Sequence, residues 1–343
     1  MVSGKEGKMI KLAIDFGSSV TKIYRADTNS GIVLAEPSCV AVSGEENQVR
    51  AIGKDAKNLI GRTAEYTRIV YPVYEGTIVD RELAVEMLKG FLSRIGIKKR
   101  ALRRAQILIN IPCGLRDKQL AEYAAVMEEC GLNSVRFVEQ PYLAALGGGA
   151  ALSESDPVFC LDIGGGVANA AVVSANGMIA GIAINVGGNN IDANIIARIA
   201  ENNQLLVGAL TAERIKNEIG TLSPSALGTM MVEGSSTTSC QPASTTVSAS
   251  ELTESIRVYI HKILEYATSV LEYLPAEVAA AVKRNGIYLS GGLMKLSYLP
   301  QYIGARLGMR YQVSEEPQFT TVLGGGVLLR DKEFLNRFSK KYD

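Results

Sequence analysis

The sequence contains one histidine, no tryptophan, and no two cysteines spaced closely enough to form a CxxC pair. Its five cysteines are Cys39, Cys113, Cys130, Cys160 and Cys240. Isolated thiols spread over 343 residues are typical of reduced, mostly buried side chains, and they favour neither a disulfide framework nor a zinc site. The histidine, His261, falls inside a long helical segment, where we expect it to pack or face solvent and not to act as a catalyst. No histidine is near Cys113 in the sequence, so we do not expect a thiol nucleophile.

The sequence also lacks an excess of charge of one sign and a long apolar run. Lys and Arg total 36 against 35 Asp and Glu, which argues against a broad electrostatic footprint for nucleic acid. The N-terminal segment MVSGKEGKMIKL has no apolar stretch of the signal-peptide kind. The most apolar segment, 168–186, is interrupted by Asn and Gly, and no stretch approaches the roughly 18 apolar residues of a membrane span. We therefore expect a cytoplasmic protein without a nucleic-acid partner.

Two segments half a chain apart share one pattern. Each of 11–25 and 158–174 consists of an apolar strand, a turn rich in glycine or serine, and a second apolar strand. The first strand ends on an aspartate in both copies, Asp15 and Asp162. The period is too long for a solenoid repeat, and 343 residues are too many for a single hydrophobic core. The pattern predicts two lobes built on the same plan.

Helical and strand patterns alternate along the rest of the chain. Apolar residues at helical spacing predict helices over 80–95, 117–130 and 251–274, each bounded by a capping residue, a glycine or a proline. The short apolar runs 106–112 and 286–292 predict buried strands. Strands that alternate with helices indicate an α/β fold in which helices cover largely buried sheets.

Two segments have the composition of insertions. Residues 35–71 are mixed in polarity, with short predicted elements. Residues 223–250 are rich in Ser and Thr, which suits either a linker or an exposed pair of strands. Because Thr and Val alternate near the end of this segment, we expect an exposed hairpin and not a disordered linker.

The repeated turns have the residues that a phosphate tail requires. They read DFGSSVTK (15–22) and DIGGGVAN (162–169). Glycine lets consecutive backbone N–H groups converge on one anion without an obstructing side chain. In the first turn Ser18 and Ser19 add hydroxyl donors, and Lys22 adds a cation. Two such turns that face each other would hold the phosphates from both sides.

The aspartates at the strand ends suit a hydrated Mg²⁺, which prefers oxygen ligands and keeps several waters. Other phosphate motifs are absent. Gly53-Lys54 is followed by Asp55, so the chain has no Walker A loop there. The glycines 164–166 precede a predicted strand and not a helix, so they are not a dinucleotide fingerprint.

The two turns, followed by GIYLSGGLMKL (286–296), resemble the phosphate and adenosine motifs of the actin, sugar-kinase and heat-shock-chaperone ATPase superfamily. Five longer segments resemble MreB-type bacterial actins and occur in the same order: 71–80, 109–114, 138–149, 212–220 and 274–292. The resemblance covers nearly the whole chain. It implies an actin-like α/β fold with two related lobes, mixed central sheets and a nucleotide cleft between the lobes. Lobe I would comprise 10–147 and 316–343, with an insertion at about 35–71; lobe II would comprise 148–315, with an insertion at about 189–250.

The resemblance also implies roles for matching residues with ATP or ADP and Mg²⁺ as ligands. Asp15 and Asp162 would hold the metal through its water ligands. The phosphate contacts would come from Gly17, Ser18, Ser19, Lys22, Gly164, Gly165 and Gly166. The adenosine pocket would be formed by Glu213, Lys216, Gly291, Gly292, Leu293 and Met294. Glu213 and Lys216 are three apart on one helical face, so without the resemblance a solvated ion pair would be the simpler interpretation.

The chain departs from the family at two catalytic positions. Glu139-Gln140-Pro141 stands where the MreB pattern has Glu-Glu-Pro, so Gln140 matches the position at which actins have a water-positioning Gln. An amide can orient a water but cannot take its proton, so we expect hydrolysis to be slow. Glu139 is the alternative base if the register shifts by one residue. The second departure, Val167-Ala168-Asn169 in place of Thr-Thr-Glu, removes hydroxyls beside the second turn.

The resemblance implies an ATPase that polymerises head to tail into cytoskeletal filaments for cell shape or intracellular organisation. A small-molecule kinase of the same superfamily, acting on a sugar or carboxylate, is the alternative, but the sequence has no spare Asp in a substrate-binding motif. A chaperone ATPase would require a following substrate domain. The N-terminal segment has no apolar helical face, so a membrane or membrane-protein partner would bind through a loop in 35–71.

Overall fold

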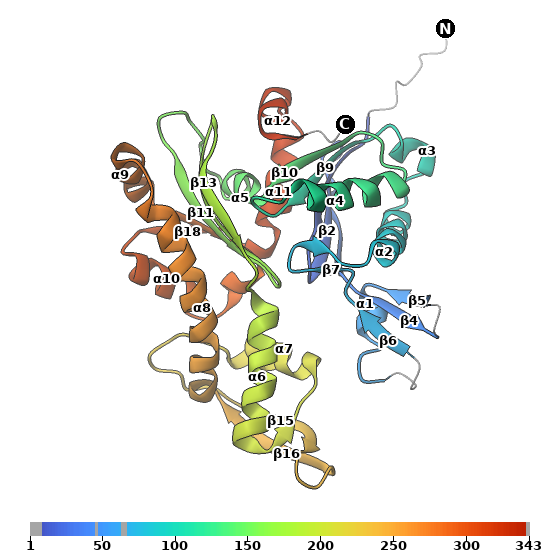
Figure 1. Ribbon diagram of the computed structural model, residues 1–343, viewed down its shortest axis with the longest axis vertical. Helices are drawn as coiled ribbons and strands as arrows, with labels where there is room; N and C mark the ends of the chain where they lie inside the picture. Colours follow the sequence, from blue (N-terminus) through green and yellow to red (C-terminus); the bar gives the residue numbers. More distant parts are fainter. Residues whose placement is uncertain (1–8, 45–46, 63–66, 341–343) are drawn as a thin grey trace.

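The computed structural model of the protein describes residues 9–44, 47–62 and 67–340, and two five-stranded sheets form its centre (Figure 1). The first sheet has the strand order β10-β9-β1-β2-β3. Its strands are β1 (Lys11–Phe16), β2 (Val20–Arg25), β3 (Gly31–Pro37), β9 (Gln106–Ile111) and β10 (Val135–Glu139). Strand β1 pairs antiparallel with β2 and parallel with β9. The β1–β2 turn therefore lies at the same sheet edge as the C-terminal end of β9.

The second sheet, β13-β12-β11-β17-β18, repeats this plan. Its strands are β11 (Val158–Ile163), β12 (Ala168–Ser174), β13 (Gly177–Ile184), β17 (Ile287–Ser290) and β18 (Tyr311–Val313). Strand β11 pairs antiparallel with β12 and parallel with β17. Each sheet thus joins a hairpin to a parallel strand, with an aspartate at the end of the first hairpin strand. The predicted pair of related lobes is confirmed.

Two helices, α5 (Gln140–Gly147) and α11 (Thr320–Leu328), pack against each other between the two sheets (Figure 1). Their backbones approach so closely that only glycine fits at the crossing. A Cβ atom at Gly147 would lie 1.9 Å from the Thr320 carbonyl oxygen, and one at Gly324 would lie 2.0 Å from that of Leu143. The hydrophobic cluster around these helices contains buried residues from both sheets. This helix pair therefore connects the lobes.

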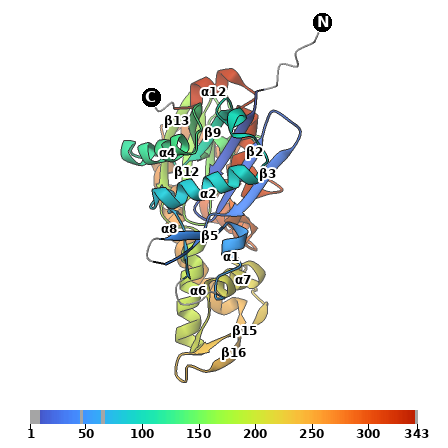
Figure 2. The same cartoon turned by 90° about the vertical axis from the view of Figure 1, so that its right-hand side faces the viewer.

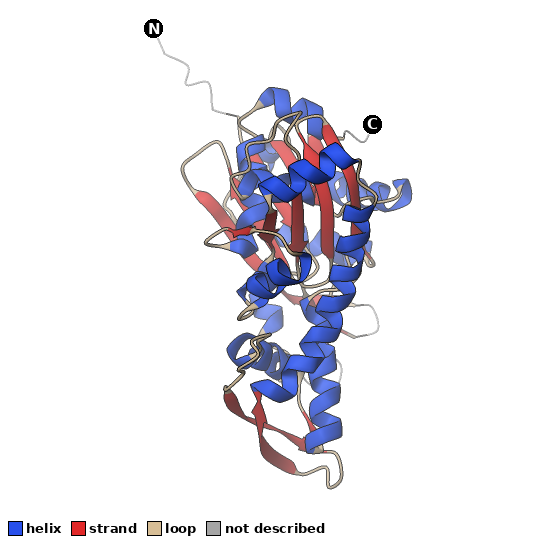
Figure 3. Ribbon diagram, turned by 90° about the vertical axis from the view of Figure 1, so that its left-hand side faces the viewer, coloured by secondary structure: helices blue, strands red, loops and turns tan. Residues whose placement is uncertain are grey.

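Further helices complete one hydrophobic core in each lobe (Figures 2 and 3). Those around the first sheet are α2 (Arg81–Arg94), α3 (Lys99–Leu102) and α4 (Asp117–Glu129). Those around the second sheet are α8 (Ala249–Glu272), α9 (Ala276–Asn285) and α10 (Leu299–Leu307). Helices α6 (Gly188–Asn203) and α7 (Ala209–Ile219) pack against each other beyond the end of the second sheet (Figure 1). The C-terminal helix is α12 (Lys332–Phe338).

Helix ends follow the local sequence signals. Asp80 caps α2 by accepting a hydrogen bond from the Leu83 amide at 3.0 Å, as its position predicts. Helix α4 ends just before Gly131, whose φ of 75° is the left-handed conformation that glycine favours. Helix α8 begins at Ala249, two residues earlier than predicted, because Ser248 and Glu251 form a capping box.

A small three-stranded sheet lies within each predicted insertion (Figure 1). The first contains β4 (Val40–Ser43), β5 (Gln48–Ile52) and β6 (Thr67–Val70), next to the short helix α1 (Lys54–Lys57). The second contains β14 (Leu205–Leu206), β15 (Thr229–Ser236) and β16 (Pro242–Ser248). The Ser/Thr-rich segment is therefore a hairpin, as expected, and not a linker. A short hairpin follows the first small sheet, and each of its strands, β7 (Val73–Tyr74) and β8 (Thr77–Ile78), has two residues.

Within the described ranges, none of the helices combines the length and the apolar character that crossing a membrane requires. The expectation that the N-terminal segment has no apolar helix concerns mainly residues 1–8, which lie outside the described residues.

Candidate nucleotide-binding cleft

A cavity of about 750 Å³ opens between the two lobes, and it collects most of the predicted site residues. The predicted residues that line it are Asp15, Gly17, Ser18, Ser19, Lys22, Gln140, Asp162, Gly164, Gly165, Gly166, Glu213, Lys216, Gly291, Gly292 and Leu293. Two predicted residues, Glu139 and Met294, are not part of the lining. Residues more than 270 positions apart in the sequence thus surround one space.

The first hairpin presents a carboxylate that is paired with a cation. Asp15 and Lys22 are directly opposite each other in the β1–β2 register. The Lys22 Nζ is 2.7 Å from Asp15 Oδ2, and the Thr321 hydroxyl donates to the same oxygen at 3.3 Å. Asp15 is only 3% exposed. Its negative charge is therefore balanced although it is buried.

The second hairpin presents a carboxylate that forms no ion pair with any of the described residues. Asp162 is 5% exposed, and its opposite residue in the β11–β12 register is Asn169. The hydroxyl of Ser290, on the parallel strand β17, donates to Asp162 Oδ1 at 2.6 Å. Burial raises the pKa of Asp162 to about 6, and the nearby charge of Asp15 adds to the increase. A cation in the cleft would favour the ionised form.

The two turns pack directly against each other. A Cβ atom at Gly165 would lie 1.9 Å from the Ser19 hydroxyl oxygen, and one at Gly166 would lie 2.9 Å from Ser18 Cβ. The Ser19 hydroxyl also donates to Asn189, on the first turn of α6, at 2.9 Å. The glycines thus permit a side-by-side arrangement of two turns with the backbone and hydroxyl groups that anions require.

The far end of the cleft contains two ion pairs that the sequence did not predict. Glu213 does not pair with Lys216; its carboxylate is 2.6 Å from Lys57 Nζ, on α1 across the cleft. Lys216 is 7% exposed, and its ammonium lies 2.7 Å from Asp192 Oδ2 and 3.1 Å from the Gly188 carbonyl oxygen. Burial raises the pKa of Asp192, and Lys216 opposes that shift. No sequence motif marks Asp192 or Lys57.

Gln140 lies at the other end, in a chain of hydrogen bonds. The Asn169 Nδ2 donates to Gln140 Oε1 at 2.6 Å, and Asn169 Oδ1 accepts from the Cys113 amide at 2.9 Å. Glu139 faces elsewhere: its Oε1 accepts from the Gly114 amide at 3.0 Å and is 3.7 Å from Lys340 Nζ. Of these two neighbouring residues, the structure brings only Gln140 to the cleft.

Asn110 is a cleft residue that the sequence analysis did not single out. It lies next to Asp15 in the parallel β1–β9 register and is 2% exposed. Neither atom of its carboxamide has a hydrogen-bond partner among the described residues. A buried amide without partners costs free energy unless a ligand or water satisfies it. A polar residue within the apolar run QILINIP was the available signal.

These features fit a nucleotide and a hydrated cation. Among the described residues, no group of three or more His, Cys, Asp and Glu side chains is arranged to hold a metal directly. A cation between Asp15 and Asp162 would therefore keep most of its water ligands, as Mg²⁺ does. The two packed turns and the unpaired Asn110 carboxamide provide donors for phosphate oxygens and for those waters.

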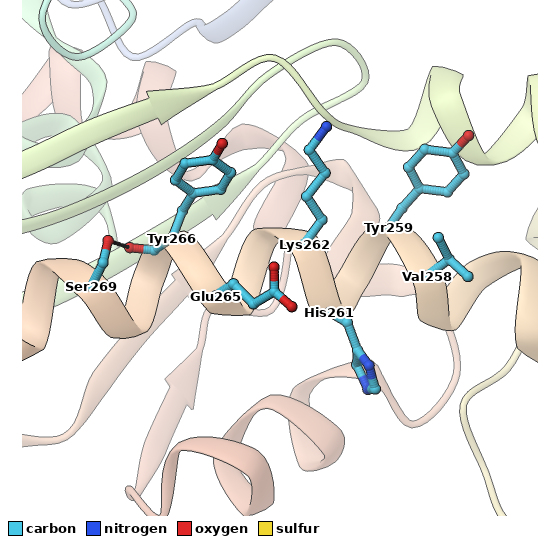
Figure 4. Close-up of a pocket in the computed structure, with 7 residues that line it drawn as sticks. All are labelled: Val258, Tyr259, His261, Lys262, Glu265, Tyr266 and Ser269. Carbon is cyan, nitrogen blue, oxygen red and sulfur yellow. Dashed lines mark hydrogen bonds between the residues drawn. The ribbon is translucent and has the colours of Figure 1, made fainter.

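A second depression, of about 650 Å³, lies on the surface of α8 (Figure 4). Its lining consists of Val258, Tyr259, His261, Lys262, Glu265, Tyr266 and Ser269. All seven side chains come from one helix, and Figure 4 shows that they do not converge on a common point. His261 hydrogen-bonds to the Tyr302 hydroxyl and stacks on that ring, so its predicted packing role is confirmed.

Comparisons with known proteins agree with this geometry. The family model described as MreB/Mbl protein matches residues 9–337. The chain is 31% identical to cell shape-determining protein MreB of Escherichia coli (strain K12), over 93% of this chain and 92% of that protein. It is 30% identical to cell shape-determining protein Mbl of Bacillus subtilis (strain 168), over 94% and 97% of the two chains.

Solved structures show the same architecture. The MreB5 protein of Spiroplasma citri bound to AMPPNP superposes with a TM-score of 0.88 at 26% identity, covering 94% of this chain and 97% of that one. A MamK double helical filament gives a TM-score of 0.76 at 17% identity, covering 94% and 99%, and supports the fold. These matches confirm the predicted actin-like fold. The chain belongs to the MreB/Mbl family of bacterial actins.

Proposed function

We propose that this chain is a cytoskeletal ATPase that binds ATP or ADP with Mg²⁺ in the interlobe cleft and polymerises into filaments. The observation that carries the proposal is the direct packing of two phosphate-type turns, one from each lobe, in a single cavity. The MreB and Mbl relatives are cell shape-determining proteins, and the MreB5 structure contains an ATP analogue. They support this function and not the kinase alternative.

The nucleotide would bind with its phosphates between the two turns. Backbone N–H groups of 17–19 and 164–166, together with the Lys22 ammonium, would contact the phosphate oxygens. Glu213 and Lys216 would lie by the ribose and base, and the backbone at 291–293 would form the adenosine wall. The sharp conformation of Gly291, with φ of 93°, brings this segment close to Ile163 at the end of β11.

Hydrolysis would occur at the Gln140 end of the cleft. A bound Mg²⁺ would neutralise phosphate charge, and Asp15 and Asp162 would orient its water ligands. Gln140 lines the cleft whereas Glu139 does not, so the neighbouring acid is poorly placed to act as base. With an amide at this position, catalysis depends on positioning and electrostatics, and turnover should be slow.

The lobes would move about the helix pair that joins them. We propose lobe I as 10–147 with 316–343 and lobe II as 148–315, with the glycine-rich segment 143–151 as part of the hinge. A contact between subunits that does not close on itself generates a filament, so nucleotide-dependent lobe closure could regulate polymerisation.

A membrane partner is the last part of the proposal, and one basic surface supports it. The segment 98–104 contains five exposed cations, at 98, 99, 100, 103 and 104, on and around α3. Each Lys or Arg near an anionic bilayer contributes on the order of 1 kcal/mol of attraction. This surface is where we would first look for binding to anionic lipid.

The proposed function is tested by sedimentation and negative-stain microscopy with Mg²⁺ and ATP, ADP or no nucleotide, alongside phosphate release. We expect filaments that depend on nucleotide. Asp162→Ala should abolish them, whereas Asp156→Ala, an exposed aspartate paired with Arg284 outside the cleft, should not. A protein that binds nucleotide but stays monomeric at high concentration would contradict the cytoskeletal function and direct attention to a substrate screen.

A further inference from the structure

The hydrogen-bond chain that ends at Gln140 begins at a backbone amide. The Cys113 N–H donates to Asn169 Oδ1 at 2.9 Å, and Asn169 Nδ2 donates to Gln140 Oε1 at 2.6 Å. Asn169 is 1% exposed, so water cannot readily replace either contact. The chain connects β9's C-terminal loop, β12 and the start of α5, which are three separate parts of the fold.

This starting point determines which way both carboxamides face. A backbone N–H can only donate, so Asn169 must turn its oxygen toward Cys113 and its nitrogen toward Gln140. The oxygen of Gln140 must then accept. Amide orientations are otherwise ambiguous because oxygen and nitrogen look alike, but here the backbone donor removes the ambiguity. Gln140 Nε2, which has no acceptor among the described residues, is left to face the cleft that Gln140 lines.

A carboxamide in this orientation turns its amino donors toward the cleft and its oxygen toward Asn169. Phosphate oxygens accept hydrogen bonds, so the Gln140 amino group suits the terminal phosphate of ATP. An attacking water is activated by a group that accepts its proton or its hydrogen bond, and in this orientation the Gln140 oxygen is turned toward Asn169 and not toward the cleft.

We propose that Asn169 is a positioning residue that holds Gln140 as a hydrogen-bond donor to the terminal phosphate of ATP and keeps its oxygen from the attacking water. This inference depends on the ATP binding proposed above and deepens it. The pair Gln140–Asn169 would make the protein distinguish ATP from ADP, and at the same time it would slow hydrolysis.

The test reverses the orientation of Gln140 by replacing the side-chain nitrogen of residue 169 with an oxygen. In Asn169→Asp, one carboxylate oxygen still accepts from Cys113, but the other can no longer donate to Gln140. Gln140 would then donate to residue 169 and turn its oxygen toward the cleft. We would measure dissociation constants for AMPPNP and ADP with Mg²⁺, by calorimetry, for the wild type, Asn169→Asp, Gln140→Ala and the double variant.

We expect Asn169→Asp to weaken AMPPNP binding five- to tenfold and ADP binding less than twofold. In the Gln140→Ala background, the same change should alter AMPPNP binding less than twofold, because Asn169 acts through Gln140. An equal loss in both backgrounds would show that the new charge acts directly on the phosphate, and would overturn the proposal. No loss in either background would overturn it as well.

Phosphate release supplies a second readout that a merely structural role would not move. We expect Asn169→Asp to raise kcat several-fold while also raising KM, because the freed Gln140 oxygen can accept from water. If Asn169→Asp does not fold, Gln140→Glu replaces it: one oxygen keeps the Asn169 contact and the second faces the cleft. Gln140→Glu should likewise weaken AMPPNP binding relative to ADP binding and raise kcat; unchanged values would contradict the inference.

The outcomes for the proposed function and for this inference can be told apart. A wild type that binds neither nucleotide would refute both, whereas normal binding without the Asn169 effect refutes this inference alone.

Discussion

The two hairpins at the cleft share one plan but differ in how they satisfy their aspartates. Asp15 and Asp162 are equally buried, at 3% and 5% exposure. Opposite Asp15 stands Lys22, and opposite Asp162, in the equivalent register, stands Asn169. The first hairpin is therefore charge-balanced, and the second has a carboxylate whose pKa is raised by burial.

The residues next to the two aspartates on the parallel strands also differ, and here it is the second hairpin that has the hydrogen-bonded neighbour. Asn110 on β9 is the neighbour of Asp15, and Ser290 on β17 is the neighbour of Asp162. Ser290 donates to its aspartate, whereas Asn110 has no partner among the described residues. Among the described residues, one half of the site thus leaves an amide without a hydrogen bond, and the other half leaves a carboxylate without a paired cation. The difference shows that two copies of one motif have become complementary halves of a single ligand site.

The largest effect should come from neutralising each aspartate in turn. Asp15→Asn leaves Lys22, whose side chain is only 14% exposed, without its partner and should lower the free energy of unfolding by about 3 kcal/mol. Asp162→Asn removes an unpaired buried charge and should raise the free energy of unfolding by up to about 3 kcal/mol at pH 7. Urea denaturation in metal-free buffer measures both. Changes of the same sign would contradict the proposed difference between the hairpins.

The stabilisation by Asp162→Asn should depend on pH. The folded pKa of Asp162, about 6, lies above its ordinary value of 3.8, so the ionised carboxylate destabilises the fold once it loses its proton. The free energy of unfolding of the wild type therefore falls as pH rises from about 4 through 6, and that of Asp162→Asn does not fall for this reason. Denaturation midpoints at several pH values should converge near pH 4 and separate at pH 7. A constant difference would show that Asp162 has an ordinary pKa.

The packing of the two turns predicts a tenfold to hundredfold loss of nucleotide affinity in Gly165→Ala, because the new methyl group overlaps Ser19. Gly208→Ala is the control: its Cβ atom would meet nothing within 4 Å, and its φ is −81°. Calorimetric titration with AMPPNP compares them. Equal affinities in the two variants would indicate that the turns can separate without loss of binding.

The parallel-strand neighbours should respond in opposite ways. Asn110→Leu removes an unsatisfied buried amide, so we expect about 1 kcal/mol of added stability and a several-fold loss of nucleotide affinity. Ser290→Ala removes a hydrogen bond and should cost about 1 kcal/mol. Thermal unfolding and nucleotide titration measure both quantities. Loss of stability in Asn110→Leu would mean that Asn110 is satisfied within the protein and does not await a ligand.

The smallest effect should come from the ion pair between Lys57 and Glu213 at the far end of the cleft. Lys57 and Glu213 are partly exposed, so their attraction contributes about 0.5 kcal/mol. Lys57→Glu should speed nucleotide release about twofold, and the exchanged pair Lys57→Glu with Glu213→Lys should restore the rate. Stopped-flow displacement of a fluorescent nucleotide measures it. The same release rate in the single and exchanged variants would exclude a role for this contact.

Much of the fold could be predicted from the sequence because its signals are local. A few neighbouring residues suffice to predict each of several features. These are the apolar strands with glycine turns at 11–25 and 158–174, the Asp80 cap, and the hairpin in 223–250 with its alternating Thr and Val. The start of α8 lies two residues before the predicted one because Ser248 and Glu251 form a capping box that the hydrophobic pattern did not show. Site residues on the repeated turns were predictable for the same reason.

The sequence by itself determined two related lobes, their phosphate-type turns and the family to which the chain belongs, because glycine conformation and strand periodicity act over short distances. Only the tertiary structure decided which polar groups meet. Lys57 reaches Glu213 over 156 positions, and Cys113 fixes Asn169 over 56. Such contacts depend on where whole sheets and helices pack, so no local pattern encodes them. Among the residues that the structure describes, the same packing left Asn110 without a hydrogen-bond partner and Asp162 without a paired cation.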